Sequence, residues 1–222
     1  HDYLLKRVPK FKEEGDAGAY YMMCSIDNKR KGTFYLNLAN LEDHQTYSTL
    51  SLSLHEGNPG HHFQLTYVND LNLPNFLTYC GDEIAYVEGW GLYSESLAHD
   101  FLKDSKKEED IMFRYGCYNY ELLRACRLVI DTGIHYYDWD FKKCMDFMKK
   151  NTTFSTGEIK NEIYRYSTYA GQALAYKIGE LKFKELKAYF LKNKMGSIKD
   201  FHKRVLELGA CSLELLEKII KK

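Results

Sequence analysis

The scarcity of proline most restricts how this chain can fold. Only 3 of its 222 residues are proline, and dipeptides typical of β-turns are few. Proline interrupts helices because its ring fixes φ and its nitrogen cannot donate a hydrogen bond, so a chain with so few prolines can form long helices. We therefore expect a mainly α-helical fold.

The charge balance and the apolar runs exclude some classes of protein. Lysine plus arginine and aspartate plus glutamate each number 31, so the net charge is zero. Affinity for a phosphate backbone needs a basic excess, so no nucleic-acid partner is expected. No segment approaches the roughly 18 consecutive apolar residues of a membrane span. The 6 cysteines are scattered, which favours unpaired thiols and a cytoplasmic location for a soluble protein.

Residue patterns divide the chain into a short β region and a longer helical region. Aromatic-rich segments within residues 19–38 predict a two-stranded ribbon. From about residue 46, apolar residues recur every three or four positions, as in helices. Ser155 and Ser197 each precede an acidic residue at the spacing of a capping box. No linker is evident, so residues 1–222 are treated as one domain. The predicted helices cover residues 49–68 with a break at 58–60, 82–102, 111–135, 139–150, 155–169 and 173–192, followed by two short helices split at Gly209.

The segment LHEGNPGHH, residues 54–62, carries the strongest functional signal. Zinc hydrolases commonly place His-Glu-x-x-His on a helix, so that two histidines bind the ion and the glutamate activates water. Here His55 and His61 are six apart, about 240° around a straight helix. A bulge at residues 59–60 restores the usual spacing, since glycine adopts unusual dihedrals and proline breaks the helix. We therefore predict His55 and His61 as zinc ligands, Glu56 as the general base, and His62 as the alternative to His61.

A catalytic zinc site needs a third protein ligand and an open fourth position. Glu88 and Glu95 flank Gly91 on one face of a predicted helix, and this glycine allows the helix to pass close to an ion. We assign Glu88 as the third ligand. Glu95 is expected to orient a ligand histidine.

These motifs resemble those of the domain-of-unknown-function 885 family. The resemblance implies a zincin-like, mainly helical metallopeptidase domain with a small β ribbon at its cleft. Family members are typically longer, so this chain resembles their C-terminal half, with an N-terminal helical half supplied elsewhere. Ala170 stands where the family usually has proline. The matching stretches are LHEGNPGHHFQ (54–64), EGWGLYSE (88–95), LRACRLVIDTGIHYYDW (123–139) and RYSTYAGQALAYKIGELK (165–182).

The resemblance also implies roles for residues that spacing alone does not identify. Arg165, Tyr166 and His135 lie in matching stretches and are expected to donate to an oxyanion or to a substrate carboxylate, with Gln172 a weaker candidate. The alternative is that Tyr166 and His135 are buried, hydrogen-bonded core residues. A buried arginine needs an anionic partner, which for Arg165 is either substrate or Asp131.

The sequence thus predicts a zinc-dependent metallopeptidase whose substrate is a peptide or a small amide. The strand predicted at residues 32–38 is expected to pair with an extended peptide at the cleft, a plain hairpin being the alternative. Two other functions remain open. One is hydrolysis of an ester or modified amide at the same zinc ion. The other is a binding or structural protein that retains the fold without catalysis, which the intact Glu56 disfavours.

Overall fold

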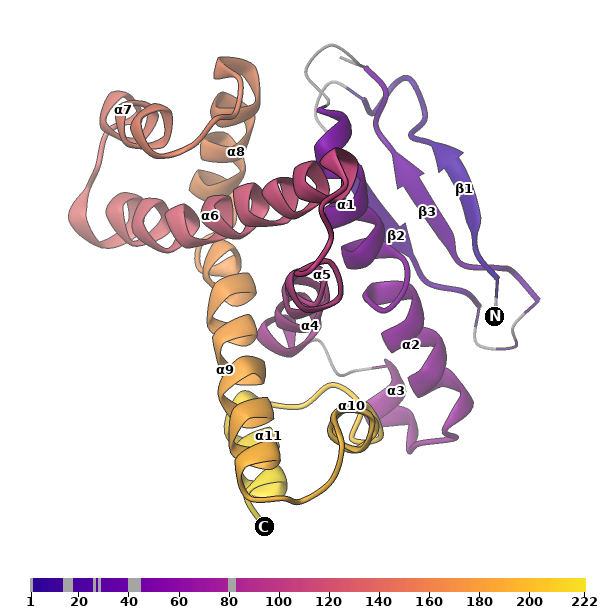
Figure 1. Ribbon diagram of the computed structural model, residues 1–222. Helices are drawn as coiled ribbons and strands as arrows, with labels where there is room; N and C mark the ends of the chain where they lie inside the picture. Colours follow the sequence, from indigo (N-terminus) through magenta and orange to yellow (C-terminus); the bar gives the residue numbers. More distant parts are fainter. Residues whose placement is uncertain (1, 14–17, 26, 28, 40–44, 80–82) are drawn as a thin grey trace.

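A small sheet and a larger set of helices make up the described chain (Figure 1). The computed structural model describes residues 2–13, 18–25, 27, 29–39, 45–79 and 83–222. Strands β1 (Leu4–Arg7), β3 (Thr33–Leu36) and β2 (Ala19–Met22) lie side by side in that order. β3 runs parallel to β1 and antiparallel to β2.

The sheet corrects the predicted two-stranded ribbon. Residues 4–7 add a third strand, which pairs with β3 in the register Leu4 to Thr33. β3 is therefore central, with both of its edges occupied, and it has no edge free to pair with a peptide. Among the described residues, the edge strand next to the helices is β2, which also contacts α1 (Thr49–Glu56).

The helical part follows the predicted pattern closely. Ser155 and Ser197 form complete capping boxes at the starts of two helices, which confirms both predictions. The break at residues 57–60 separates two distinct helices instead of bending one. The helix predicted from residue 82 begins at Ile84 among the described residues, and residues 80–82 lie outside them. Besides α1 and the 3-10 turn Thr46–Ser48, the helices are α2 (His61–Asp70), α3 (Asn75–Tyr79), α4 (Ile84–Ser96), α5 (Ala98–Phe101), α6 (Glu108–Tyr137), α7 (Phe141–Asn151), α8 (Thr156–Thr168), α9 (Gln172–Lys192), α10 (Ile198–Leu206) and α11 (Leu213–Ile220).

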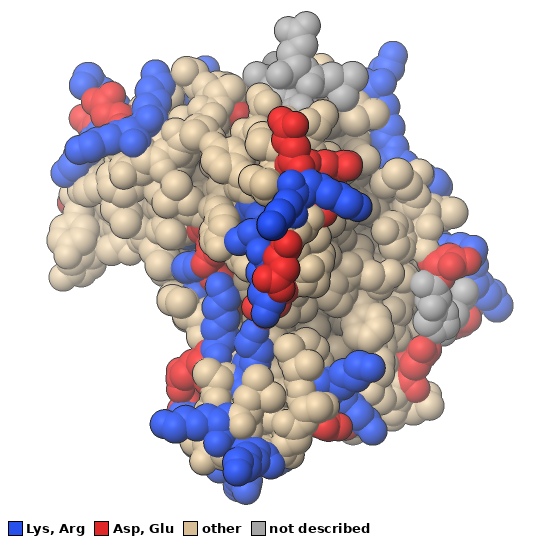
Figure 2. Space-filling view, viewed as in Figure 1, with Lys and Arg blue, Asp and Glu red and all other residues tan. Residues whose placement is uncertain are grey.

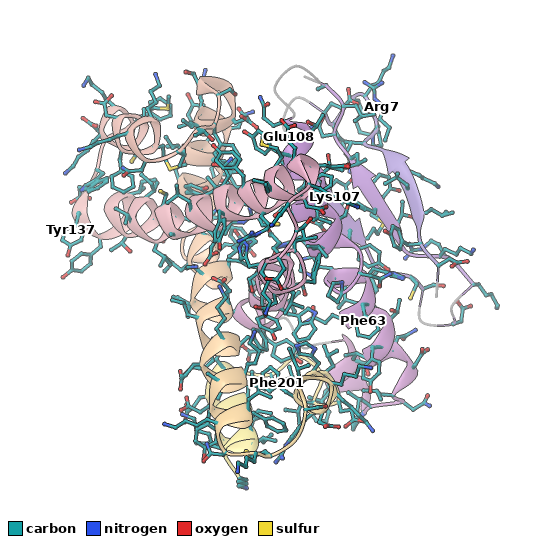
Figure 3. All side chains as sticks on the ribbon, in the orientation of Figure 1. Arg7, Phe63, Lys107, Glu108, Tyr137 and Phe201 are labelled. Atoms are coloured by element: carbon teal, nitrogen blue, oxygen red, sulfur yellow. The ribbon has the colours of Figure 1, made fainter. Side chains whose placement is uncertain are left out.

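Helix α6 crosses the molecule and joins its parts. Figure 3 shows Lys107 and Glu108 at the end of α6 nearest the sheet, and Tyr137 at its far end. Along its length α6 contacts α1, α4, α8 and α9. Basic and acidic side chains are interspersed over the face seen in Figure 2, in keeping with the zero net charge.

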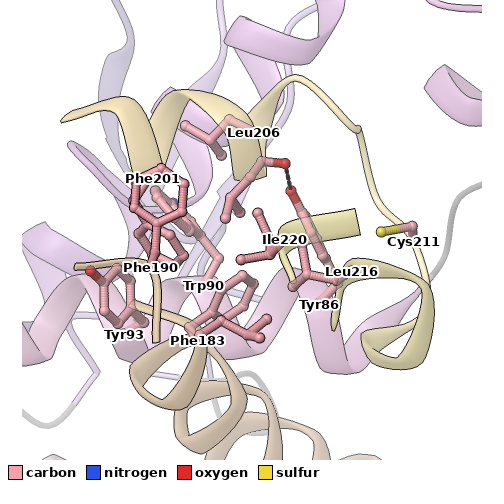
Figure 4. Packing of buried hydrophobic residues seen from close by; sticks show 12 residues of the cluster. Tyr86, Trp90, Tyr93, Phe183, Phe190, Phe201, Leu206, Cys211, Leu216 and Ile220 are labelled. Carbon is pink, nitrogen blue, oxygen red and sulfur yellow. Dashed lines mark hydrogen bonds between the residues drawn. The ribbon is translucent and has the colours of Figure 1, made fainter. Parts of the chain in front are cut away.

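The largest buried cluster lies between α4, α9 and the two C-terminal helices (Figure 4). Trp90 and Tyr93 of α4 pack against Phe183 of α9, with ring centroids 5.7 and 5.9 Å apart. Such aromatic packing buries a large apolar area. The cluster fixes α4, which carries two of the predicted site residues, against α9.

Two glycines allow α4 and α9 to approach closely, and this contact carries a stability prediction. A Cβ on Gly179 would lie 2.0 Å from the Ala85 carbonyl oxygen and 2.5 Å from the Gly89 Cα. We expect Gly179→Ala to force the helices apart and to lower the free energy of unfolding by about 2 kcal/mol or more. In thermal unfolding the midpoint should fall by about 4–8 °C.

Gly157→Ala is the matched control for that substitution. Its Cβ would meet nothing closer than the Ser155 Oγ at 3.9 Å. Alanine also favours helices over glycine, so the control should not lose stability. Equal midpoints for the Gly179 variant and the wild type would contradict the prediction.

No helix among the described residues is both long and apolar enough to span a bilayer. The described cysteines Cys117, Cys126, Cys144 and Cys211 are free and buried, and Cys24 is also buried. Cys80 lies outside the described residues.

Candidate metal centre

A tight reversal between α1 and α2 brings the two predicted histidine ligands together. A Cβ on Gly60 would lie only 1.8 Å from the carbonyl oxygen of His55, so glycine alone permits this approach. The Trp90 indole donates to the Pro59 carbonyl at 2.8 Å and anchors the turn to α4. The His55 and His61 rings consequently lie nearly perpendicular, with centroids 4.7 Å apart.

Both imidazoles converge on one carboxylate oxygen. His55 Nε2 and His61 Nε2 each lie 3.3 Å from Glu88 Oε2. Two donors that are each about 2.1 Å from a tetrahedral zinc ion are themselves about 3.4 Å apart, so the spacing suits a shared ion. His61 Nδ1 is buried and has no hydrogen-bond partner among the described residues. The donor set of two histidines and a glutamate therefore fits zinc.

Glu95 and Gly91 hold His55 in place. His55 Nδ1 lies 2.7 Å from Glu95 Oε1, which leaves Nε2 directed at Glu88. A Cβ on Gly91 would lie 2.7 Å from the His55 ring, so this glycine makes room for the imidazole. Glu95 also accepts from Ser51 Oγ and pairs with Arg124 Nη2 at 3.3 Å. Glu95 thus lies against His55, as expected of a carboxylate beside a candidate ligand histidine.

Charge interactions at the centre outweigh the cost of burial. Burial opposes protonation of His55, but its hydrogen bonds to Glu88 and Glu95 raise its pKa to about 9. Burial also opposes ionisation of Glu88, but His55 and His61 hold the pKa of this carboxyl well below its usual value. The carboxylates around His55 therefore favour positive charge at this position.

Glu56 lies beside the two histidines without being engaged by other side chains. One donor atom from each of His55, Glu56 and His61 lies within 4.8 Å of the others. No hydrogen bond or ion pair to Glu56 occurs in the part of the chain that the structure describes. Its side chain lines a cleft, so its carboxylate is open to a reacting water.

The cleft has a volume of about 860 Å³ and runs between the sheet and the helices. Strand β2 contributes one wall through Ala19, Tyr20 and Tyr21, and α8 contributes another through residues that include Arg165. His55, His61 and Glu88 also line this cleft. A cleft of this volume is within the range of small-molecule and peptide sites.

The structure separates the two candidate histidines at the start of α2. His61 faces Glu88, whereas His62 Nδ1 lies 2.9 Å from the Tyr21 hydroxyl and its ring packs 4.7 Å from that of Tyr3. Burial lowers the pKa of His62. His62 therefore faces the sheet and not the metal centre.

The three residues suggested by the resemblance alone have different positions. Arg165 lines the cleft, with Nη2 3.0 Å from the Tyr176 hydroxyl. Tyr166 instead points into the core, where its hydroxyl bonds Arg127 and Glu162. His135 Nε2 lies 2.9 Å from the Tyr166 carbonyl oxygen, and His135 is not among the cleft-lining residues. The core interpretation therefore holds for Tyr166, whereas His135 is exposed on α6 and lies neither in the core nor on the cleft.

The neighbours of Arg165 also differ from those predicted. Asp131 accepts a hydrogen bond from the backbone nitrogen of Gly171 instead of pairing with Arg165. The carboxylate of Glu162 lies 3.8 Å from Arg165 Nη1. Gln172 lies beside Arg165, with Oε1 3.4 Å from Nη2.

Tyr176 is the site residue that sequence reasoning missed. Its hydroxyl donates to Glu88 Oε1 at 3.0 Å and lies between this predicted ligand and Arg165. Burial, followed by the nearby Glu88 charge, raises the pKa of Tyr176. Its position four residues after Gln172, on the same helix face, was the available signal.

Fold and site together define a class: a mainly helical domain with a buried histidine–glutamate centre on the wall of a cleft. The chain belongs to the family described as "Bacterial protein of unknown function (DUF885)", whose pattern matches residues 1–220. No curated protein matches the chain.

Two solved structures share the fold. A candidate lipoprotein from Colwellia psychrerythraea is 31% identical, with a TM-score of 0.92, and the match covers 100% of this chain and 38% of that chain. A candidate lipoprotein of unknown function from Shewanella oneidensis is 20% identical, with a TM-score of 0.79, and the match covers 100% of this chain and 40% of that chain. This chain therefore spans well under half the length of both similar proteins.

Proposed function

We propose that this chain is a zinc-dependent hydrolase that cleaves peptide bonds, with a zincin-like site in the C-terminal part of a longer family architecture. The observation that supports it best is the approach of His55 and His61 to one oxygen of Glu88, each at 3.3 Å. Glu56, unengaged and open to the cleft, lies beside them. A merely structural zinc site would be closed by a fourth protein ligand and would not need this carboxylate.

The residues of the chain have distinct roles in this proposal. His55, His61 and Glu88 hold the ion, and Glu95 keeps His55 in the orientation that binds it. A zinc ion bound there lowers the pKa of a water molecule and polarises the substrate carbonyl. Glu56 would accept a proton from a water molecule in the cleft and return it to the leaving amine. Tyr176 fixes Glu88 through its hydroxyl.

Metal content is the direct test. Purified chain, stripped with a chelator and then dialysed against zinc, should hold about one ion per chain. A pool of peptides, followed by mass spectrometry, should show cleavage that the chelator stops. Cleavage of esters but not of peptides would assign the site to a different hydrolase. Folded protein that takes up no zinc would overturn the proposal.

His61 and His62 provide a matched pair of substitutions for that experiment. His61→Ala should weaken zinc binding by more than about 100-fold, because it removes a ligand from the ion. His62→Ala should leave the zinc content unchanged, because this ring faces Tyr21 and Tyr3. Titration with a competing zinc chelator measures both affinities. Loss of zinc from the His62 variant alone would contradict the ligand assignment.

The cellular location of the protein does not follow from the proposed chemistry. The unpaired thiols favoured the cytoplasm, whereas the two similar structures are named as candidate lipoproteins. The cytoplasmic location remains a prediction from the cysteines.

A further inference from the structure

Arg165, on the wall of the cleft formed by α8 and α9, has a guanidinium group whose hydrogen-bond donors are only partly paired. Arg165 lines the cleft, and 36% of its side chain is exposed. Nη2 donates to Tyr176 and lies 3.4 Å from Gln172 Oε1. Nη1 is 3.8 Å from Glu162, beyond hydrogen-bonding distance. Arg165 therefore keeps a donor edge available for a ligand in the cleft.

The charges around Arg165 leave room for one further anion. Arg127 and Arg165 both face Glu162, and Arg127 Nη2 bonds this carboxylate at 2.6 Å. Arg127 is 4% exposed, and its Nη1 has no partner among the described residues. Arg124, the third arginine of the cleft, is compensated by Glu95. Within the described part of the chain, Arg127 and Arg165 thus share one carboxylate, and a planar anion suits the charge that it leaves unmatched.

The distance from this charge to the metal centre limits what the anion can be. The Tyr176 hydroxyl lies 3.0 Å from Arg165 Nη2 and 3.0 Å from Glu88 Oε1. Nη2 is therefore no more than about 6 Å from the Glu88 carboxylate, which is shorter than two residues of extended chain. An anion held by Arg165 lies one or two peptide units from a carbonyl group at the metal centre.

The opposite wall suits the other end of an extended peptide. Strand β2 is at the edge of the sheet, and its residues 19–21 line the cleft. Figure 1 shows the sheet and α8 on opposite sides of α1, which carries His55 and Glu56. Backbone groups at the edge of a sheet can pair with an extended peptide. A substrate can therefore run from β2 past the metal centre towards Arg165.

We infer that the site takes peptides with a free C-terminal carboxylate and removes one or two residues from that end. The inference depends on the proposed function and adds Arg165 as the group that binds the carboxylate. In the reaction, water oxygen joins the carbonyl carbon, the C–N bond breaks, and the proton taken by Glu56 passes to the released amine. The net reaction consumes one water and needs no other reactant.

Paired substrates test this inference. N-acetylated pentapeptides are made with a C-terminal acid or a C-terminal amide and incubated with the zinc-loaded chain. Mass spectrometry identifies the bond that is cut. Acids should be cleaved about 100-fold faster than amides, and only at the last or the second-last bond. Arg165→Gln should lower the rate on acids about 10- to 100-fold more than the rate on amides, so that the preference for acids is lost.

Two variants control for charge and for folding. Lys160→Gln removes a positive charge from the same helix, at an exposed side chain on the cleft rim, and should keep the preference for acids. Arg165→Lys should recover part of the preference, because it keeps the charge but loses the planar fork. Circular dichroism and zinc content establish that each variant is folded and loaded.

A binding measurement keeps the inference separate from the proposed function. In the zinc-loaded Glu56→Gln variant, calorimetry should show that an N-acetyl tripeptide acid binds at least about 10-fold more tightly than its amide. Adding Arg165→Gln should abolish that difference. If no peptide is cut but the acid still binds through Arg165, the hydrolase proposal fails and the carboxylate site remains. If acids and amides are cut or bound alike, the carboxylate site is wrong. An equal loss on both substrates in Arg165→Gln would instead assign Arg165 to positioning Tyr176, and would likewise overturn the inference.

Discussion

Replacing Glu56 with glutamine is expected to reduce peptide hydrolysis by about 10²- to 10⁴-fold while zinc remains bound. Glutamine has nearly the same shape as glutamate but cannot accept a proton at neutral pH, so the variant removes the base alone. Glu56 makes no hydrogen bond or ion pair with the described residues, so little of the fold depends on its charge. Single-turnover rates, compared at equal zinc content, measure the effect on the chemical step.

The zinc content of the Glu56 variants decides how a loss of their activity is interpreted. If Glu56→Gln loses zinc together with activity, Glu56 is itself a ligand and the assignment of Glu88 is wrong. Glu56→Asp keeps the carboxylate but shortens its reach, and we expect a rate between those of glutamine and wild type. Turnover by Glu56→Gln equal to that of the wild type would remove the general base from the mechanism.

Local sequence signals were sufficient for the helices and insufficient for the sheet. The capping boxes at Ser155 and Ser197 involve residues three apart, and the structure contains both. Strand β1 was missed because its four residues are all exposed and show no alternation of apolar and polar side chains. Its existence depends on pairing with β3, a contact between distant parts of the chain. The choice of edge strand was wrong for that reason.

The candidate site likewise contains residues that local sequence identifies and residues that only tertiary packing identifies. His55, Glu56 and His61 belong to one short segment, whose close return at Gly60 is a local property of glycine. Arg165 and Tyr166 are adjacent on α8, so their side chains point about 100° apart, and of the two only Arg165 lines the cleft. Helix periodicity does not show which of the two does so. Tyr166 turns inward because it packs in a buried cluster with residues of other helices, and these contacts cannot be read from the sequence alone.

Glu95→Gln is expected to have the largest effect on stability among the residues of the site. Although burial opposes its ionisation, Arg124 and then His55 hold the pKa of Glu95 below its usual value. Neutralising Glu95 leaves Arg124, 6% exposed, without its carboxylate partner. An uncompensated buried charge costs about 3–5 kcal/mol, so the thermal midpoint should fall by about 6–20 °C.

The same substitution should weaken zinc binding by about 10- to 100-fold, because His55 Nδ1 loses its charged acceptor. The double variant Glu95→Gln/Arg124→Met separates the two effects. It buries no unpaired charge, so most of the lost stability should return, while zinc affinity stays low because His55 still faces a neutral amide. Thermal unfolding of the metal-free proteins gives the first quantity and chelator competition gives the second. Recovery of zinc affinity together with stability would show that Glu95 acts on the metal centre only through the fold.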